Sequence, residues 1–443
     1  MSLPPSPSIA APVRLRARLR PLITRQRRGV VLSLGARALE AGAKFGLYAL
    51  AARALGGHDA GRFFLALSVI QIVSTVARLG LDRPMTRHVA AELAVGDTRA
   101  AWRAAVTGCG AVAGSSCLVA FVLALGAPWI AERVLNQADM VSVLVLAAVI
   151  IPVQNLAFAM ASVLVGLERS VAAQMVMNAL APALSLAALI LWADEVHRLL
   201  SVYAAAFGVC ALLGLVVMLA EVRRRSGVVA LVKPAAALPS LWQGARPLWI
   251  SEVAQAALLS VPVLVLGAFA DPQAVSVFSI CSRLSMLVTT VVLSLGALSA
   301  PVFARHHRLG DWSALRDAVT TNRKTTILLC VPLTAGLAIG AGPMLELLGI
   351  PVAAGAPVLL ILLVGQLAYC LLPSRDLVLA MAGHGRALRG LSLWQLAGCV
   401  ALCLVLIPPF GAVGAALSSA TIWIGGATAL AMIARRRLPQ LTL

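Results

Sequence analysis

Residues 140–167 read MVSVLVLAAVIIPVQNLAFAMASVLVGL and contain no charged side chain. A helix of this length, at about 1.5 Å per residue, exceeds the roughly 30 Å hydrocarbon thickness of a bilayer. Residues 202–219 and 393–407 form further apolar runs of nearly the same kind. These runs are continuous rather than alternating, and a helix pairs its own backbone groups inside lipid, so they predict membrane-spanning helices rather than strands.

Composition supports the same class of protein along the whole chain. Hydrophobic residues make up 60% of the 443 residues and charged residues only 12%, whereas soluble domains have about 45–50% and about 25%. The apolar runs predict an all-α integral membrane protein of about twelve spans. We place them at residues 31–53, 62–82, 104–127, 140–167, 172–192, 199–220, 247–270, 274–303, 325–347, 355–382, 390–408 and 411–434.

The net charge of +19 is distributed unevenly between the two sides of the predicted membrane. Segments on the side of the N-terminus hold 27 of the 36 Lys and Arg residues, and the opposite loops hold four. Because basic residues concentrate in cytoplasmic loops, both termini are predicted to be cytoplasmic, which requires an even number of spans. The basic excess is therefore a topology signal, and we expect no nucleic-acid partner.

The two halves of the chain carry a weak internal repeat. The paired positions are Glu40 with Glu252, Asp59 with Asp271, Gly96-Asp97 with Gly310-Asp311, and Arg169 with Arg386. The offset grows from 212 to 217 residues, as small loop insertions between two copies of one unit would produce. Six spans return a chain to its starting side, so the halves are expected to be parallel six-helix repeats around a central cavity.

This repeat divides the chain into five predicted segments. They are a cytoplasmic basic tail at 1–30, an N-terminal lobe at 31–220, a cytoplasmic linker at 221–246, a C-terminal lobe at 247–434 and a cytoplasmic tail at 435–443. The first apolar stretch is long and contains charges, so it predicts an uncleaved span rather than a signal peptide. The eight cysteines lie inside predicted spans without ligand spacing, so we expect packing roles, no disulfide, no metal and no cofactor.

Residues 45–97, FGLYALAARALGGHDAGRFFLALSVIQIVSTVARLGLDRPMTRHVAAELAVGD, resemble the N-terminal pattern of bacterial polysaccharide flippases of the O-antigen type. That pattern is a span, a Gly-containing external turn, a second span, and then a Gly-Leu segment leading to R-x-V-A and G-D elements. These flippases belong to the multidrug/oligosaccharidyl-lipid/polysaccharide (MOP) exporter superfamily. Lipid II flippases of that superfamily commonly have fourteen spans, two more than this sequence predicts.

The resemblance implies a fold like that of multidrug and toxin extrusion (MATE) transporters, in the bacterial inner membrane. It implies transport of an undecaprenyl-diphosphate-linked oligosaccharide from the cytoplasmic to the periplasmic leaflet by alternating access. Such transport serves lipopolysaccharide or exopolysaccharide synthesis. The implied partners are the lipid-linked substrate, membrane lipids, and a polysaccharide polymerase or glycosyltransferases.

Ionisable side chains inside spans are costly, so each is a functional hypothesis. Five basic residues are candidates for binding the diphosphate: Arg37, Lys44, Arg78, Arg283 and Arg375. Arginine suits phosphate because its planar fork donates paired hydrogen bonds. Three carboxylates are candidates for ion coupling: Glu40, Glu252 and Asp376.

Three of these candidates also have a structural interpretation. Glu40 and Lys44 have the i, i+4 spacing of a helical ion pair, and so do Arg78 and Asp82 near the cytoplasmic end of the second span. The amides in the spans could meet sugar hydroxyls or join neighbouring helices. They are Gln71, Gln154, Asn155, Gln255, Gln366 and Gln395.

Three other functions are weighed against the flippase hypothesis. A cation-coupled multidrug or metabolite exporter of the same superfamily could use Glu40, although five basic residues in the spans suit an anion better. A major-facilitator transporter also has parallel six-span halves, but residues 80–88, GLDRPMTRH, lack the glycines and spacing of its loop motif. An enzyme is not expected, because the external loops are short and contain no paired carboxylates, HExxH, phosphate-binding loop or nucleophile elbow.

Overall fold

The computed structural model describes residues 11–191, 195–226, 238–309, 311–371, 379 and 385–437. These residues are almost entirely helical, and no β-strand occurs among them. The first half contains α1 (Ala11–Ala77), α2 (Asp82–Ala94), α3 (Thr98–Trp129), η1 (Ile130–Val134), α4 (Met140–Gly166), α5 (Ser170–Gln174), η2 (Met175–Ala179), α6 (Leu180–Leu191) and α7 (Val196–Ser226). The second half contains α8 (Leu238–Phe269), α9 (Pro272–Leu309), α10 (Trp312–Ile339), α11 (Ala341–Leu347), α12 (Val352–Leu371) and α14 (Gly385–Arg437).

The number of membrane-crossing segments agrees with the sequence. Within the described residues, nine helices are long and apolar enough to span a membrane, and the bent pair α10–α11 makes a tenth. Two of the nine, α1 and α14, continue across kinks at Gly56 (φ 73°) and Gly411 (φ 53°), a backbone region that favours glycine. Counting both arms of each kinked helix gives twelve segments, so the predicted all-α membrane fold is confirmed.

Some element boundaries differ from those predicted. Helix α1 begins at Ala11, so much of the predicted basic tail continues the first span as helix. The tenth span, predicted at residues 355–382, corresponds to α12 (Val352–Leu371) as far as residue 371, and residues 372–378 and 380–382 lie outside the described residues. Residues 227–237 of the predicted linker lie outside the described residues.

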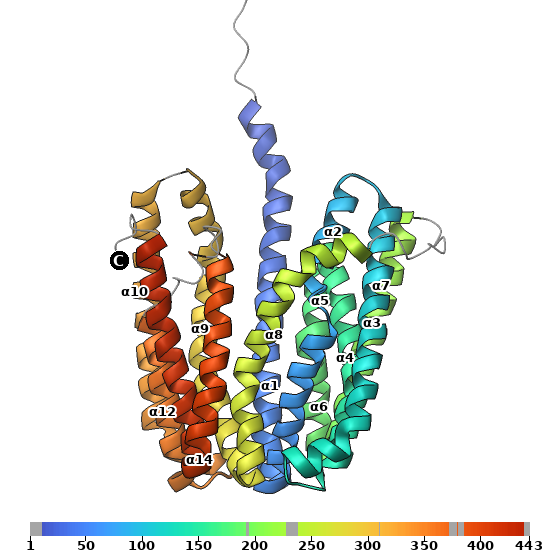
Figure 1. Ribbon diagram of the computed structural model, residues 1–443. Helices are drawn as coiled ribbons and strands as arrows, with labels where there is room; N and C mark the ends of the chain where they lie inside the picture. Colours follow the sequence, from blue (N-terminus) through green and yellow to red (C-terminus); the bar gives the residue numbers. More distant parts are fainter. Residues whose placement is uncertain are drawn as a thin grey trace, which may run out of the picture.

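The helices form two bundles that converge at the lower edge of Figure 1 and diverge toward its upper edge. In the first bundle α4 packs against α3 and α7, and in the second α14 packs against α8 and α12. Helix α1 joins the bundles, because it also packs against α8 and α9. We call these bundles the N-terminal lobe (α1 to α7) and the C-terminal lobe (α8 to α14).

Two positions paired in the repeat have the same local structure. Asp97 accepts a hydrogen bond from the Ala100 backbone nitrogen at 2.8 Å, and Asp311 accepts one from Ala314 at 3.0 Å. Their backbone angles are nearly identical, at φ −83°, ψ 81° and φ −83°, ψ 82°. Each aspartate caps the N-terminus of a long helix, α3 or α10, and both helices start at the upper edge of Figure 1.

The lobes meet closely where the kink of α1 faces the start of α9. A Cβ atom placed on Gly61 would lie 1.8 Å from the Pro272 carbonyl oxygen, so the two backbones touch directly. Nearby, the Gln137 side-chain nitrogen donates to the Gly267 carbonyl oxygen at 3.2 Å. These contacts hold the lobes together at the end of the molecule opposite the two capped helix starts.

We predict that Gly61→Ala destabilises the protein, because the new methyl group cannot fit against the Pro272 backbone. Overpacking of this kind costs about 1–3 kcal/mol. Gly110→Ala in α3 is the matched control, since no heavy atom lies within 4 Å of its added Cβ. Thermal unfolding of both variants in detergent should show a lower midpoint for Gly61→Ala alone, and equal midpoints would contradict the close contact.

The second capping aspartate predicts a pH effect on stability. Hydrogen bonds from the Ala314 backbone N–H and, with a smaller effect, from the Ser313 hydroxyl hold the pKa of Asp311 below its ordinary value. A carboxylate with a lowered pKa stabilises the fold at neutral pH, and this contribution is lost as pH falls through the lowered value. Asp311→Asn keeps a capping oxygen but does not ionise, so acid should lower the unfolding midpoint less in this variant than in wild type. A parallel loss in both proteins would exclude this role for the carboxylate.

Candidate functional site

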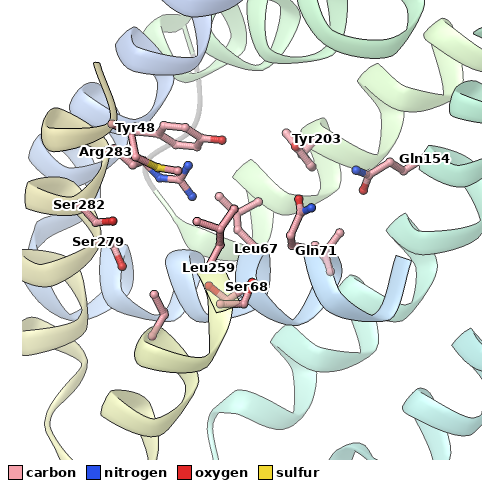
Figure 2. Close-up of a pocket in the computed structure, with 14 residues that line it drawn as sticks. Tyr48, Leu67, Ser68, Gln71, Gln154, Tyr203, Leu259, Ser279, Ser282 and Arg283 are labelled. Carbon is pink, nitrogen blue, oxygen red and sulfur yellow. The ribbon is translucent and has the colours of Figure 1, made fainter. Parts of the chain in front are cut away.

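Two adjoining pockets lie between the lobes. The first, about 380 Å³, we call the charged chamber; it is lined by Glu40, Lys44 and Tyr48 of α1, Gln174 and Asn178 of α5 and η2, and Arg283, Thr290 and Ser294 of α9, among others. The second, about 200 Å³, we call the hydroxyl chamber; its polar lining is Tyr48, Ser68, Gln71, Gln154, Tyr203, Ser260, Ser279, Ser282 and Arg283. Figure 2 shows the side chains of the hydroxyl chamber, which come from both lobes. Tyr48 and Arg283 line both chambers and connect them.

Arg283 is held by aromatic rings rather than by a carboxylate. Its guanidinium carbon lies 3.7 Å from the centre of the Tyr48 ring and 5.8 Å from that of Phe64. Its Nε atom is buried and has no hydrogen-bond partner among the described residues. A ring face attracts a cation without using its N–H groups, so this guanidinium keeps donors available for an anion.

Lys44 and Glu40 form the ion pair expected from their spacing. Lys44 Nζ donates to Glu40 Oε1 at 2.7 Å, and Gln174 Nε2 donates to the other oxygen, Oε2, at 2.6 Å. The Lys44 side chain remains 36% exposed and lines the charged chamber. Lys44 and Glu40 therefore form an ion pair and also line the charged chamber.

Arg78 and Glu252 lie away from both chambers. Arg78 forms a buried ion pair with Asp82, at 3.3 Å, and its guanidinium carbon lies 4.9 Å from the centre of the Phe158 ring. The pair is inside the N-terminal lobe rather than on a surface, because the two side chains are only 12% and 14% exposed. Glu252 faces Arg83 across the lobes, at 3.5 Å.

The remaining candidates cannot be placed in the site. Arg37 belongs to α1, but its side chain is not among those described. Arg375 and Asp376 lie outside the described residues. Of the predicted set, the structure therefore brings together Lys44, Arg283 and Glu40.

The predicted amides divide between the two roles considered. Gln71 and Gln154 line the hydroxyl chamber. Asn155 instead donates to the Ser74 carbonyl oxygen at 3.2 Å and to the Ser116 hydroxyl at 2.9 Å, and Gln255 donates to the Ser392 hydroxyl at 3.0 Å. These last two amides join helices rather than face a ligand.

Sequence reasoning missed the hydroxyl groups of the site. Serines are common in spans and give no signal alone, but the chain has only three tyrosines, of which Tyr48 and Tyr203 line the hydroxyl chamber. A buried tyrosine hydroxyl needs a polar neighbour. Tyrosines inside predicted spans were therefore a usable signal for polar surroundings between the helices. Within the described part of the chain, no group of three or more His, Cys, Asp or Glu side chains could hold a metal ion.

The described residues thus form twelve helical segments in two lobes, with two polar chambers between the lobes. The chain belongs to the family described as "Polysaccharide biosynthesis protein", whose profile matches residues 27–307. A search of curated proteins finds no significant sequence match.

Solved structures share this fold over almost the whole chain. An inward-facing MATE family multidrug resistance transporter has a TM-score of 0.72 at 15% identity, covering 93% of this chain and 98% of that one. The lipid II flippase MurJ, in an inward closed conformation, has a TM-score of 0.74 at 12% identity, covering 91% and 87%. A MOP superfamily transporter from Pyrococcus furiosus, described as having a binding pocket of reverse polarity, has a TM-score of 0.58 at 16% identity, covering 93% and 94%.

We predict that inorganic diphosphate binds the charged chamber and raises the thermal unfolding midpoint, because a ligand of the native state stabilises it. Arg283→Gln should weaken this binding about tenfold or more, since a hydrogen bond to a charged group contributes about 1.5–3 kcal/mol. Tyr48→Leu should weaken it less, because the ring orients the guanidinium without touching the ligand's charge. Arg99→Gln, at an exposed position outside the chambers, is the charge-matched control. An unchanged response of Arg283→Gln would exclude the chamber as the diphosphate site.

Proposed function

We propose that this protein moves an undecaprenyl-diphosphate-linked oligosaccharide from the cytoplasmic to the periplasmic leaflet of the bacterial inner membrane. The observation that carries the proposal is Arg283, a cation between the lobes that lines both chambers and has unused donors. Membership of the polysaccharide biosynthesis protein family and the likeness of the fold to MurJ support it.

The two chambers suit the two parts of such a headgroup. A diphosphate entering the protein loses hydration, and Lys44 and Arg283 offset that loss through charge-assisted hydrogen bonds. The sugars that follow the diphosphate are rich in hydroxyls, which serine, glutamine and tyrosine side chains can pair with in either direction. Arg283 lies where the two chambers meet, so it suits the junction between diphosphate and first sugar.

The position of the lobes suggests the route of transport. The lobes touch at Gly61 and Pro272, where α9 begins, and the two bundles converge at the lower edge of Figure 1. The basic loops lie at the opposite edge, and by the positive-inside rule that edge faces the cytoplasm together with both termini. We infer that the lower contacts close the periplasmic side in the described conformation, and that their separation opens that side.

A cation-coupled multidrug or metabolite exporter remains the second candidate. Glu40 lies in the charged chamber, and the fold resembles a MATE transporter at a TM-score of 0.72. Both oxygens of Glu40 are already bonded, however, to Lys44 and Gln174. The two cations in this chamber outnumber its one carboxylate, which favours an anionic substrate over a cationic drug.

Complementation of a flippase deletion strain tests the proposal. Arg283→Ala and Lys44→Ala should each lower surface polysaccharide about tenfold while leaving protein abundance unchanged, because the lost interaction is with substrate. Arg283→Lys should keep part of the activity, since a point charge attracts phosphate but lacks the paired donors. Arg99→Gln controls for loss of a single charge.

Two results would overturn this assignment. Full polysaccharide output from both alanine variants would show that the chamber cations do not serve transport. Loss of both variants from the membrane would show that the cations support folding instead.

A further inference from the structure

A third pocket lies on another face of α1, between α1 and α11. Its volume is about 300 Å³, and we call it the outer groove; its lining includes Phe45, Gly46, Leu50, Arg53, Met344 and Leu347. Apart from Arg53 these residues are apolar, and Leu347 is 67% exposed. A groove with this lining on a membrane-spanning helix suits a hydrocarbon chain.

Arg53 gives one end of the outer groove a positive charge. It is exposed, and none of the ion pairs among the described residues involves it. The end of α11 lies beside it, because a Cβ atom placed on Gly349 would be 3.8 Å from the Arg53 Cα atom. The kink of α1 follows at Gly56, so this end of the groove lies near the edge where the lobes touch.

The outer groove and the charged chamber share one lining residue. Phe45 lines both, and its neighbour Lys44 lines the charged chamber. Arg53 is nine residues further along α1 than Lys44, which corresponds to about 14 Å of helix rise. Cations therefore lie at two levels along one helix, and apolar residues of the outer groove lie between those levels.

We propose that the outer groove is an exit site for the lipid-linked diphosphate, in which Arg53 binds the phosphates and the apolar residues bind the isoprenoid chain. This inference rests on the proposed function. A hydrocarbon chain leaves lipid for the groove without hydrophobic gain, since lipid tails are equally apolar. Selection of the lipid-linked diphosphate over ordinary phospholipids must therefore come from Arg53, because Arg53 pairs more strongly with a diphosphate than with the single phosphate of a phospholipid.

Photo-crosslinking tests the occupant directly. Leu347 is replaced by p-benzoylphenylalanine, and the purified full chain is illuminated in lipid nanodiscs with radiolabelled undecaprenyl diphosphate. The matched control carries the same photoreactive residue at Leu328 of α10, a leucine that is 71% exposed and does not line the outer groove. We expect labelling at position 347. Excess unlabelled undecaprenyl diphosphate should abolish this labelling, and excess phosphatidylglycerol should leave it unchanged. Adding Arg53→Gln should lower that labelling about fivefold or more.

The possible outcomes separate this inference from the proposed function. Equal labelling at positions 347 and 328, or equal competition by phosphatidylglycerol, would show that the groove holds ordinary membrane lipid and would overturn the exit site. A filter-binding measurement on the unmodified chain accompanies the crosslinking. If the chain binds undecaprenyl diphosphate, and Lys44→Gln and Arg283→Gln weaken that binding, but position 347 is not labelled, then only the exit site is overturned. Absence of any binding of undecaprenyl diphosphate would overturn both proposals.

Discussion

The constraint on which the structure depends is a guanidinium group placed between two membrane-embedded lobes without a carboxylate partner among the described residues. Burying an unpaired cation is costly, and the cost has to be offset locally. Here the Tyr48 and Phe64 rings of the N-terminal lobe approach Arg283 of the C-terminal lobe. The hydroxyl chamber supplies further polar groups around it. Packing of α1 against α9 therefore joins the two lobes and also surrounds the Arg283 charge with aromatic and polar groups.

A second consequence concerns how the lobes can separate. Their contact at Gly61 and Pro272 is backbone against backbone, with no side chain between. At the other edge, the Trp249 indole nitrogen donates to the Val76 carbonyl oxygen at 3.1 Å, and Arg83 faces Glu252. The contact at Gly61 and Pro272 is steric, whereas the contacts at the other edge are a hydrogen bond and an ion pair. A change in side-chain size therefore affects the first edge, and a change in charge or pH affects the other. A transporter that opens one edge at a time needs such independent contacts.

Sequence reasoning predicted the spans well, because a long apolar run has few alternatives in a membrane. Lys44 and Arg283, which were selected as basic residues inside single spans, both line the charged chamber. Sequence reasoning gave Arg78 both a binding interpretation and an ion-pair interpretation, and the structure shows the ion pair with Asp82. The direction in which a side chain points depends on how its helix is rotated against its neighbours. Phe158 of α4 receives Arg78, and no spacing within α1 reveals that contact. The hydroxyl chamber was missed for the same reason, since its lining is divided among five helices, α1, α4, α7, α8 and α9, which each contribute one to five residues.

The π-helical segment η2 has a consequence for the Glu40 carboxylate. A π turn holds one more residue than an α turn, and each residue advances a helix by about 100°. Gln174, which donates to Glu40, is the last residue of α5, and Asn178 of the charged chamber lies within η2 itself. If the π turn shifted to another position in this span, Gln174 would rotate relative to α6 and the helix would stay intact. Such a shift of the π turn would change the hydrogen bond from Gln174 to the Glu40 carboxylate without unfolding any helix.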